Sequence, residues 1–149
     1  VAGVVLVALA ARLGDGPLGP FPGGALATGE WVTPAPSDWS FAADLRELDL
    51  QLERPLSSRR TWLVVRDGVL YIPCGLPNQL KRWPHHAQRD GRAVLRLAGR
   101  RYRVQLAQVT DPQLHNALAQ DASRKYGFEV REQADPDDVW FFAVAPRPG

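Results

Sequence analysis

The stretch RRTWLVVRDGVLYIPCGLPNQLKRWPHHAQRDGRAVLRLAGRRYRVQLAQV, residues 59–109, decides the fold. Its first part is a β-branched and aromatic run at residues 61–65, followed by Asp67-Gly68 and a second run at residues 69–72. Asp-Gly is a preferred tight-turn pair between antiparallel strands because glycine tolerates positive φ. These residues predict a β-hairpin, and because residues 61–65 are apolar on both faces, we expect that strand to be covered on both sides.

A second hairpin follows a basic connector at residues 73–90. Strands are predicted at residues 93–98 and 102–109, around a Gly99-Arg100 turn, because apolar residues alternate with arginine and glutamine along both runs. Two hairpins joined through a cationic segment are compatible with a barrel wall that carries an anion site at its rim.

The sequence before this stretch adds further strand signal. In residues 38–53, Leu48, Leu50 and Leu52 alternate with polar residues. This period of two predicts one long strand or two short ones, with one face exposed to water.

The sequence after this stretch predicts a helix and a last strand. Asp111 suits an N-cap, Pro112 suits the first helical position, and Gly127 lies where a C-terminal cap would fall. Residues 139–145 form an apolar run typical of a buried strand. The whole pattern predicts a mainly β (α+β) fold, a small antiparallel barrel with one or two helices.

Charge is distributed unevenly along the chain of 149 residues, which is long enough for one domain with a real core. The net charge is +2, yet residues 54–103 alone carry a balance of +10 and the flanks −8. Such a basic middle predicts an anionic ligand or surface, or else a solvated barrel exterior with outward arginines. The single cysteine excludes an intrachain disulfide.

The N-terminal end is a separate question. Residues 1–11 are uninterrupted apolar sequence, fewer than the ~20 residues that span a bilayer. Residues 1–13 are compatible with a truncated membrane anchor, a signal-peptide remnant or a buried element of the fold. Residues 14–37 are predicted to be a Gly/Pro-rich linker and residues 38–146 the folded domain. This arrangement favours a membrane-anchored, periplasmic or exported protein, with a cytoplasmic one as the alternative.

Lys81, Arg82 and Trp83 are the first candidates for chemistry. Adjacent cations can clamp a phosphate, and an indole can stack on a planar ring. At the mouth of the first hairpin, Arg59, Arg60 and Thr61 could add a guanidinium fork and a hydroxyl to the same anion. The alternative is that Trp83 plugs the barrel while the cations stay in solvent.

Cys74 and Gly75 directly follow a predicted strand. Glycine there would let a planar ligand approach the backbone closely, while Cys74 is best interpreted as a small, partly buried residue. The histidines at positions 85, 86 and 115 lack a carboxylate at ligand-like spacing, so no metal site is predicted. No phosphate-binding loop, Gly-x-Ser-x-Gly elbow or His-Glu-x-x-His helix occurs, and no nucleic-acid partner is expected.

The layout of residues 62–126 resembles the split-barrel flavin-binding superfamily, typified by pyridoxamine 5′-phosphate oxidase and the deazaflavin-dependent nitroreductases. Three pieces carry the resemblance: DGVLYIP at residues 67–73, KRW leading to RDGR at residues 81–92, and AVLRL with GRRY and VTD at residues 93–111.

The resemblance implies a split barrel that forms a homodimer and holds FMN or a deazaflavin at the dimer interface. The phosphate would bind cations at Arg60 and at Lys81 or Arg82, with Thr61 assisting, and the ring would lie along residues 73–75. It therefore implies a flavin-dependent oxidoreductase. The usual serine or threonine cluster before the phosphate lysine is absent here, where residues 75–79 read GLPNQ. A non-catalytic envelope module with a basic, anion-binding face is the alternative function.

Overall fold

The computed structural model describes residues 1–75, 81–130 and 135–148. Within these residues the chain forms one curled sheet in the order β3-β2-β6-β7-β8-β5-β4, in which every neighbouring pair is antiparallel. A short strand, β1, pairs in parallel with the first half of β7. The strands are β1 (Glu30–Val32), β2 (Leu48–Leu52), β3 (Ser57–Thr61), β4 (Val64–Arg66), β5 (Val69–Gly75), β6 (Arg92–Leu97), β7 (Arg100–Gln108) and β8 (Val139–Pro146). The helices are α1 (Ala2–Leu13), the 3-10 turn η1 (Ser40–Ala42), α2 (Trp83–Arg89) and α3 (Pro112–Tyr126).

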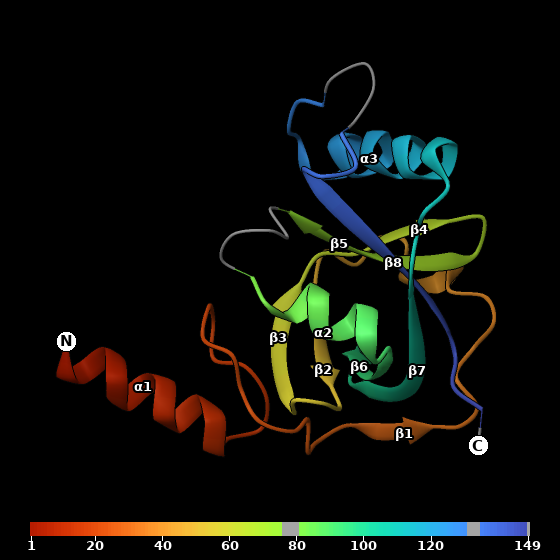
Figure 1. The fold of residues 1–149 in the computed structure, drawn as a ribbon. Coiled ribbons are helices and arrows are strands. Elements are labelled where there is room, and N and C mark those ends of the chain that lie inside the picture. The colour runs from red at the N-terminus through yellow and green to blue at the C-terminus, as the bar shows by residue number, and fades with distance from the viewer. Residues whose placement is uncertain (76–80, 131–134, 149) are drawn as a thin grey trace.

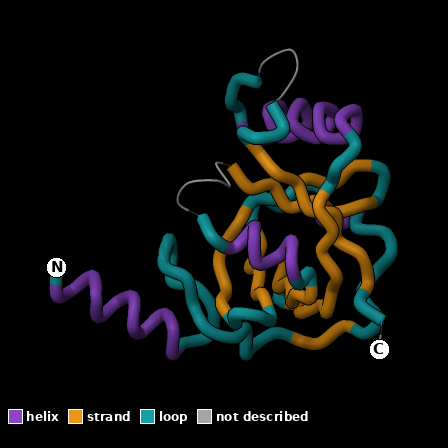
Figure 2. Tube along the Cα trace, viewed as in Figure 1, coloured by secondary structure: helices purple, strands orange, loops and turns teal. Residues whose placement is uncertain are grey.

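Figure 1 shows that the sheet is curled. Its buried residues form two apolar clusters, a larger inner core and a smaller outer core. The inner core contains Trp39, Leu50, Leu95 and Phe142, which are each at most 1% exposed. The outer core lies beneath α3, where Leu118 and Phe141 are buried. Figure 2 shows α2 lying against the body of strands, with α3 as a separate layer. The mainly β barrel predicted from the sequence is confirmed.

Both predicted hairpins are present. The β4–β5 turn has Asp67 at φ 50° and Gly68 at φ 77°, as the Asp-Gly pair predicts. The β6–β7 turn lies one residue earlier than expected, with Ala98 at φ 49° and Gly99 at φ 74°. The predicted turn position was wrong because an alanine, which rarely adopts positive φ, occupies the first turn position.

The strand predicted at residues 61–65 is divided between two strands at opposite edges of the sheet. Thr61 ends β3, which pairs with β2, and Val64 begins β4, which pairs with β5. Between them, Leu63 is fully buried, and its backbone N–H donates to the Tyr126 hydroxyl at 3.1 Å. A side chain of α3 thus takes the place of a ladder partner where the chain crosses the split in the barrel.

The strand signal in residues 38–53 is borne out only in its second half, as β2, while part of the first half forms η1. The expected wet face of β2 was wrong, because Asp49 and Gln51 are each only 7% exposed. Residues of the Gly/Pro-rich segment cover them. The Leu26 N–H donates to Oε1 of Gln51 at 2.7 Å, and the Ser58 hydroxyl donates to the Gly24 carbonyl at 2.6 Å.

An ion network ties this covering segment to the sheet. Arg96 on β6 donates to Asp49 at 3.0 Å and to Asp15 at 2.7 Å. The Asp15 carboxylate also accepts from the Thr28 hydroxyl and from the backbone N–H groups of Ala27 and Thr28. The contacts place this part of residues 14–37 against the barrel, while the domain limits at residues 13 and 37 stay a prediction.

The C-terminal elements follow the sequence signals. The Asp111 carboxylate accepts from the backbone N–H groups at the start of α3, and Gly127 ends the helix in the left-handed conformation. The strand predicted at residues 139–145 is β8.

Helix α1 lies apart from the sheet, and Figure 1 shows it projecting from the body of the molecule. Only Ala11 of its residues is buried, while Leu6 is 66% and Leu9 is 53% exposed. Among the described residues, no helix is both long enough and apolar enough to cross a bilayer.

The Asp15 network predicts a pH-dependent contribution to stability. The Thr28 hydroxyl, then the backbone N–H of Ala27 and the Arg96 guanidinium, hold the pKa of Asp15 well below its ordinary value. A carboxylate with a lowered folded-state pKa stabilises the fold above its unfolded pKa of about 3.9 and loses this effect as the pH falls. We expect Asp15→Asn to lower the free energy of unfolding at pH 7, with the deficit shrinking below about pH 4.

Urea denaturation followed by tryptophan fluorescence at a series of pH values would measure this. Glu30→Gln is the control, because Glu30 is an exposed carboxylate 3.9 Å from Arg100. A deficit that stayed constant down to pH 3 would show that the Asp15 charge is not the source of the stabilisation.

Candidate functional site

A cavity of about 650 Å³ opens between β3, β5, β8 and α3. Its volume lies in the range of about 300–1,000 Å³ typical of small-molecule and cofactor sites. It is lined by Arg60, Thr61, Trp62, Pro73, Gly75, Lys81, Ala119, Ala122, Phe128, Glu129, Val130, Asp135, Asp138, Val139 and Phe141.

The structure brings four of the seven residues predicted from the sequence to this one cavity: Arg60, Thr61, Gly75 and Lys81. Arg60 and Thr61 end β3, and Gly75 ends β5. A methyl group placed on Gly75 would meet no atom of the described residues within 4 Å, so on their side the backbone of this strand end is open to a ligand.

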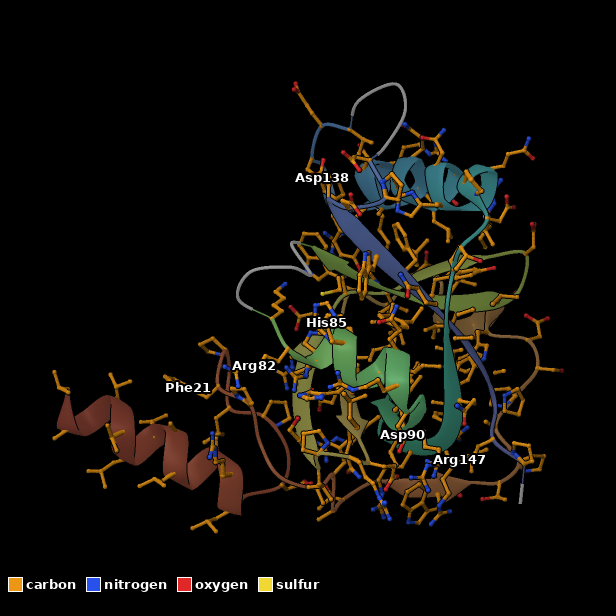
Figure 3. The ribbon with its side chains drawn as sticks, in the orientation of Figure 1. Phe21, Arg82, His85, Asp90, Asp138 and Arg147 are labelled. Atoms are coloured by element: carbon orange, nitrogen blue, oxygen red, sulfur yellow. The ribbon has the colours of Figure 1, made fainter. Side chains whose placement is uncertain are left out.

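The other three predicted residues lie elsewhere. Trp83 is 5% exposed and packs against Phe142, with 5.7 Å between ring centroids, so it fills the barrel beneath α2. Cys74 is 1% exposed and belongs to the inner core. Arg82 directly precedes α2, is exposed, and does not line the cavity. Figure 3 labels it near α2.

Arg60 is not free to serve a ligand alone. Its Nε donates to Asp49 at 3.2 Å and lies 3.8 Å from the Glu47 carboxylate. Its charge is therefore already partly compensated by the neighbouring strand.

Arg59, the neighbour of Arg60 on β3, is not among the residues that line the cavity. Burial lowers the pKa of its guanidinium, which lies 5.6 Å from the Trp83 ring. Its Nη2 donates to the Ser57 hydroxyl at 2.7 Å, whereas its buried Nε has no partner among the described residues. The different positions of Arg59 and Arg60 follow from the alternation of side chains along β3, because adjacent residues on a strand point to opposite faces.

The Cys74 thiol is not set up as a nucleophile. Burial raises the pKa of the Cys74 thiol to about 11, although Lys81 and Arg59 both act to lower it. Lys81 lines the cavity, while Arg59 lies beside Trp83.

The histidines have structural contacts. His115 donates from Nε2 to the Val139 carbonyl at 2.7 Å, which joins α3 to β8. His86 lies 2.8 Å from the Arg89 guanidinium, and His85 packs edge-on against Trp140. In the described part of the chain, no three histidine, cysteine or acidic side chains gather as metal ligands would.

Sequence reasoning missed the second half of the cavity wall. Trp62 follows β3, while Phe128, Glu129, Asp135 and Asp138 come from the connection between α3 and β8. These residues follow no motif, because only the packing of α3 on the sheet brings them to β3. Figure 3 shows Asp138 beside α3, and Arg82, which lies outside the cavity, near α2.

Comparison with solved structures shows the class of fold. The chain superposes with a TM-score of 0.52 and 13% identity on a structure described as "Putative Pyridoxamine 5'-phosphate oxidase" from Listeria innocua, over 69% of this chain and 85% of that one. It superposes with a TM-score of 0.51 and 13% identity on an "F420 Reductase", over 76% of this chain and 97% of that one. No family model and no curated protein matches the sequence.

The chain therefore has the split-barrel fold, and the resemblance noted from residues 62–126 is confirmed at the level of the fold. At 13% identity the comparison establishes the fold and leaves the activity to the site itself.

The burial of Cys74 gives a direct test of this description of the site. We expect the native thiol to react with an aromatic disulfide reagent at pH 8 at least about 100-fold more slowly than in guanidinium, because burial blocks access and its raised pKa depletes the thiolate. Cys74 is the chain's single cysteine, so absorbance reports that residue alone. Equal rates in the native and denatured states would contradict its burial.

Proposed function

We propose that the chain binds a flavin-type cofactor, FMN or a deazaflavin, in the cavity between β3, β5, β8 and α3 and acts as an oxidoreductase. The observation that supports this most is the meeting of Arg60, Thr61, Gly75 and Lys81 at one cavity. The fold is shared with solved structures whose names include an oxidase and a reductase.

The residues present fit such a group. Lys81 supplies a point charge for a phosphate, the Thr61 hydroxyl lines the same cavity and can donate to it, and the half-buried Arg59 on β3 adds positive potential. The open strand end at Gly75 leaves room for a planar ring against backbone. Arg60 contributes less than expected, because Asp49 and Glu47 hold its guanidinium.

The protein's part in the reaction is binding and orientation. A bound flavin or deazaflavin supplies the hydride chemistry. The apolar side chains of Ala119, Ala122 and Phe141 line the wall beside it and limit the access of water. None of the described residues is assigned a catalytic role.

The protein is further proposed to form a homodimer and to be held at a membrane through α1. The first proposal follows from the resemblance to split-barrel proteins. The second is supported by the exposure of apolar side chains on all sides of α1, since Val4, Val5, Leu6 and Val7 point in successive directions around the helix and are each 43–66% exposed.

Cofactor binding is tested by titrating the purified protein with FMN and with a deazaflavin, followed by cofactor fluorescence. We expect Lys81→Ala to weaken binding about 10- to 100-fold, since a hydrogen bond to a charged group contributes about 1.5–3 kcal/mol. Arg82→Ala is the matched control, an adjacent cation outside the cavity, and should leave the Kd unchanged.

Equal effects of Lys81→Ala and Arg82→Ala on the Kd would contradict the proposed contact between Lys81 and the phosphate. Failure of both cofactors to bind would overturn the oxidoreductase proposal and favour the non-catalytic module with an anion-binding face.

Membrane attachment is tested by flotation of the full chain with vesicles of phosphatidylcholine and phosphatidylglycerol. We expect the chain to float with the vesicles and Leu6→Glu with Leu9→Glu to abolish this, because burial of each CH₂ in lipid contributes about 0.8 kcal/mol. Leu56→Glu is the control, a similarly exposed leucine in the β2–β3 turn. A chain that sediments without lipid would contradict the attachment.

A further inference from the structure

We propose that Trp62 and Phe128 form a stacking platform for a planar aromatic cation, which is the substrate or redox partner of the cofactor. This inference rests on the proposed function and adds to it the chemical class of the second ligand. Its basis is that Trp62 and Phe128 are exposed at the cavity wall. Packing of the core does not require large aromatic side chains at such exposed positions.

The platform is rigid because Tyr126 supports it from below. The Trp62 and Tyr126 rings are parallel within 3°, with 4.1 Å between their centroids, and Phe128 lies 6.1 Å from Trp62 at 19°. The Tyr126 hydroxyl accepts from the Leu63 N–H and lies 2.8 Å from the Arg46 carbonyl and 2.9 Å from that of Leu63. The Trp62 ring is therefore held in a fixed plane before any ligand arrives.

The platform is also exposed at the cavity. Trp62 is 45% and Phe128 is 41% exposed, and both line the cavity wall. The other exposed aromatic side chains of the described residues have different settings: Trp31 lies under the guanidinium groups of Arg101 and Arg103, and Phe41 stacks on Trp39. Among aromatic side chains, tryptophan attracts a cation over its ring face most strongly.

The charge of the surrounding wall favours a cationic ligand. Glu129, Asp135 and Asp138 line the same cavity, and in the described part of the chain none of these carboxylates forms an ion pair. On the basic side, Asp49 already compensates Arg60, which leaves Lys81 for the phosphate of the cofactor. Arg46 and Lys125 lie against the Tyr126 ring, behind the platform, and neither lines the cavity. Among the described residues, the charge on the cavity side of the aromatic wall is therefore negative, so it attracts a positive ring and repels an anionic one.

The experiment compares three ligands built on one ring system: N-methylphenazinium, neutral phenazine and phenazine-1-carboxylate. Their affinities are measured by calorimetry in the dark, with the protein both free and loaded with oxidised FMN. We expect N-methylphenazinium to bind about 10-fold more tightly than phenazine and the carboxylate to bind most weakly. Binding of the cation should persist in the FMN-loaded protein.

Substitutions then separate stacking from charge. Trp62→Leu should weaken all three ligands about 10-fold, and Trp62→Phe should restore most of the loss. Glu129→Gln with Asp138→Asn should remove the preference for the cation while neutral phenazine still binds. Trp31→Leu and Glu30→Gln are matched controls on β1, an exposed aromatic and an exposed acid outside the cavity, and should change nothing.

The outcomes distinguish this inference from the proposed function. If N-methylphenazinium binds but neither FMN nor a deazaflavin does, the proposed function is contradicted, while the assignment of Trp62 and Phe128 as a site for an aromatic cation is supported. Binding of the cofactor with equal affinities across the three phenazines, or equal effects of Trp62→Leu and Trp31→Leu, would overturn the platform alone. Loss of cation binding on FMN loading would show that the wall holds the cofactor ring itself and would overturn the assignment to a second ligand.

Discussion

The crossing of the chain at Leu63 is the constraint on which the rest of the molecule depends. Here the backbone leaves β3 at one edge of the sheet and enters β4 at the other. Its polar groups find their partners on α3, where Tyr126 accepts from the Leu63 N–H and Lys125 donates to the Leu63 carbonyl at 3.0 Å. A buried backbone group without a partner costs about 1–3 kcal/mol, so the helix and the split in the barrel stabilise each other.

This crossing also builds the site. Thr61 and Trp62 stand at the cavity because the chain turns away from the β2 ladder immediately after them. The same helix residues that satisfy Leu63 fix the Tyr126 ring beneath Trp62. Substitution in this region would therefore change the geometry of the ligand site and the closure of the barrel together.

Local sequence signals predicted the elements whose chemistry is local. Asp67-Gly68 produced a turn with two positive φ angles, and Asp111 with Gly127 bounded a helix. The burial of Asp49 and Gln51 could not be predicted, because their partners are distant in sequence. Leu26 donates to Gln51, and Arg96 bridges Asp49 to Asp15. Alternation with a period of two shows only that the two faces of a strand differ in polarity. It does not distinguish a polar face exposed to water from one that is covered by a buried ion network.

The candidate site shows the same limit. The cations before α2 and at the end of β3 could be predicted as candidate site residues from the sequence, because they lie close to predicted strand ends and, in β3, beside a hydroxyl group. Whether each one is available depends on its neighbours: Arg60 is held by Asp49, while Lys81 reaches the cavity and Arg82, one residue later, does not. The acidic and aromatic half of the cavity is assembled by the docking of α3, a tertiary event with no local signature.

In the folded chain, less of the positive charge of residues 54–103 is available to a ligand than the sequence suggests. Arg60 and Arg96 pair with Asp49, Arg96 also pairs with Asp15, and Arg66 pairs with Asp121 of α3. Much of the +10 balance is thus met by acids of the flanking segments, which fold back onto the basic strands. The potential that remains for a ligand is set by a few side chains around one cavity, where Lys81 faces an aromatic wall flanked by carboxylates. A cavity polarised in this way can hold an anionic cofactor and a cationic partner at the same time without bringing like charges together.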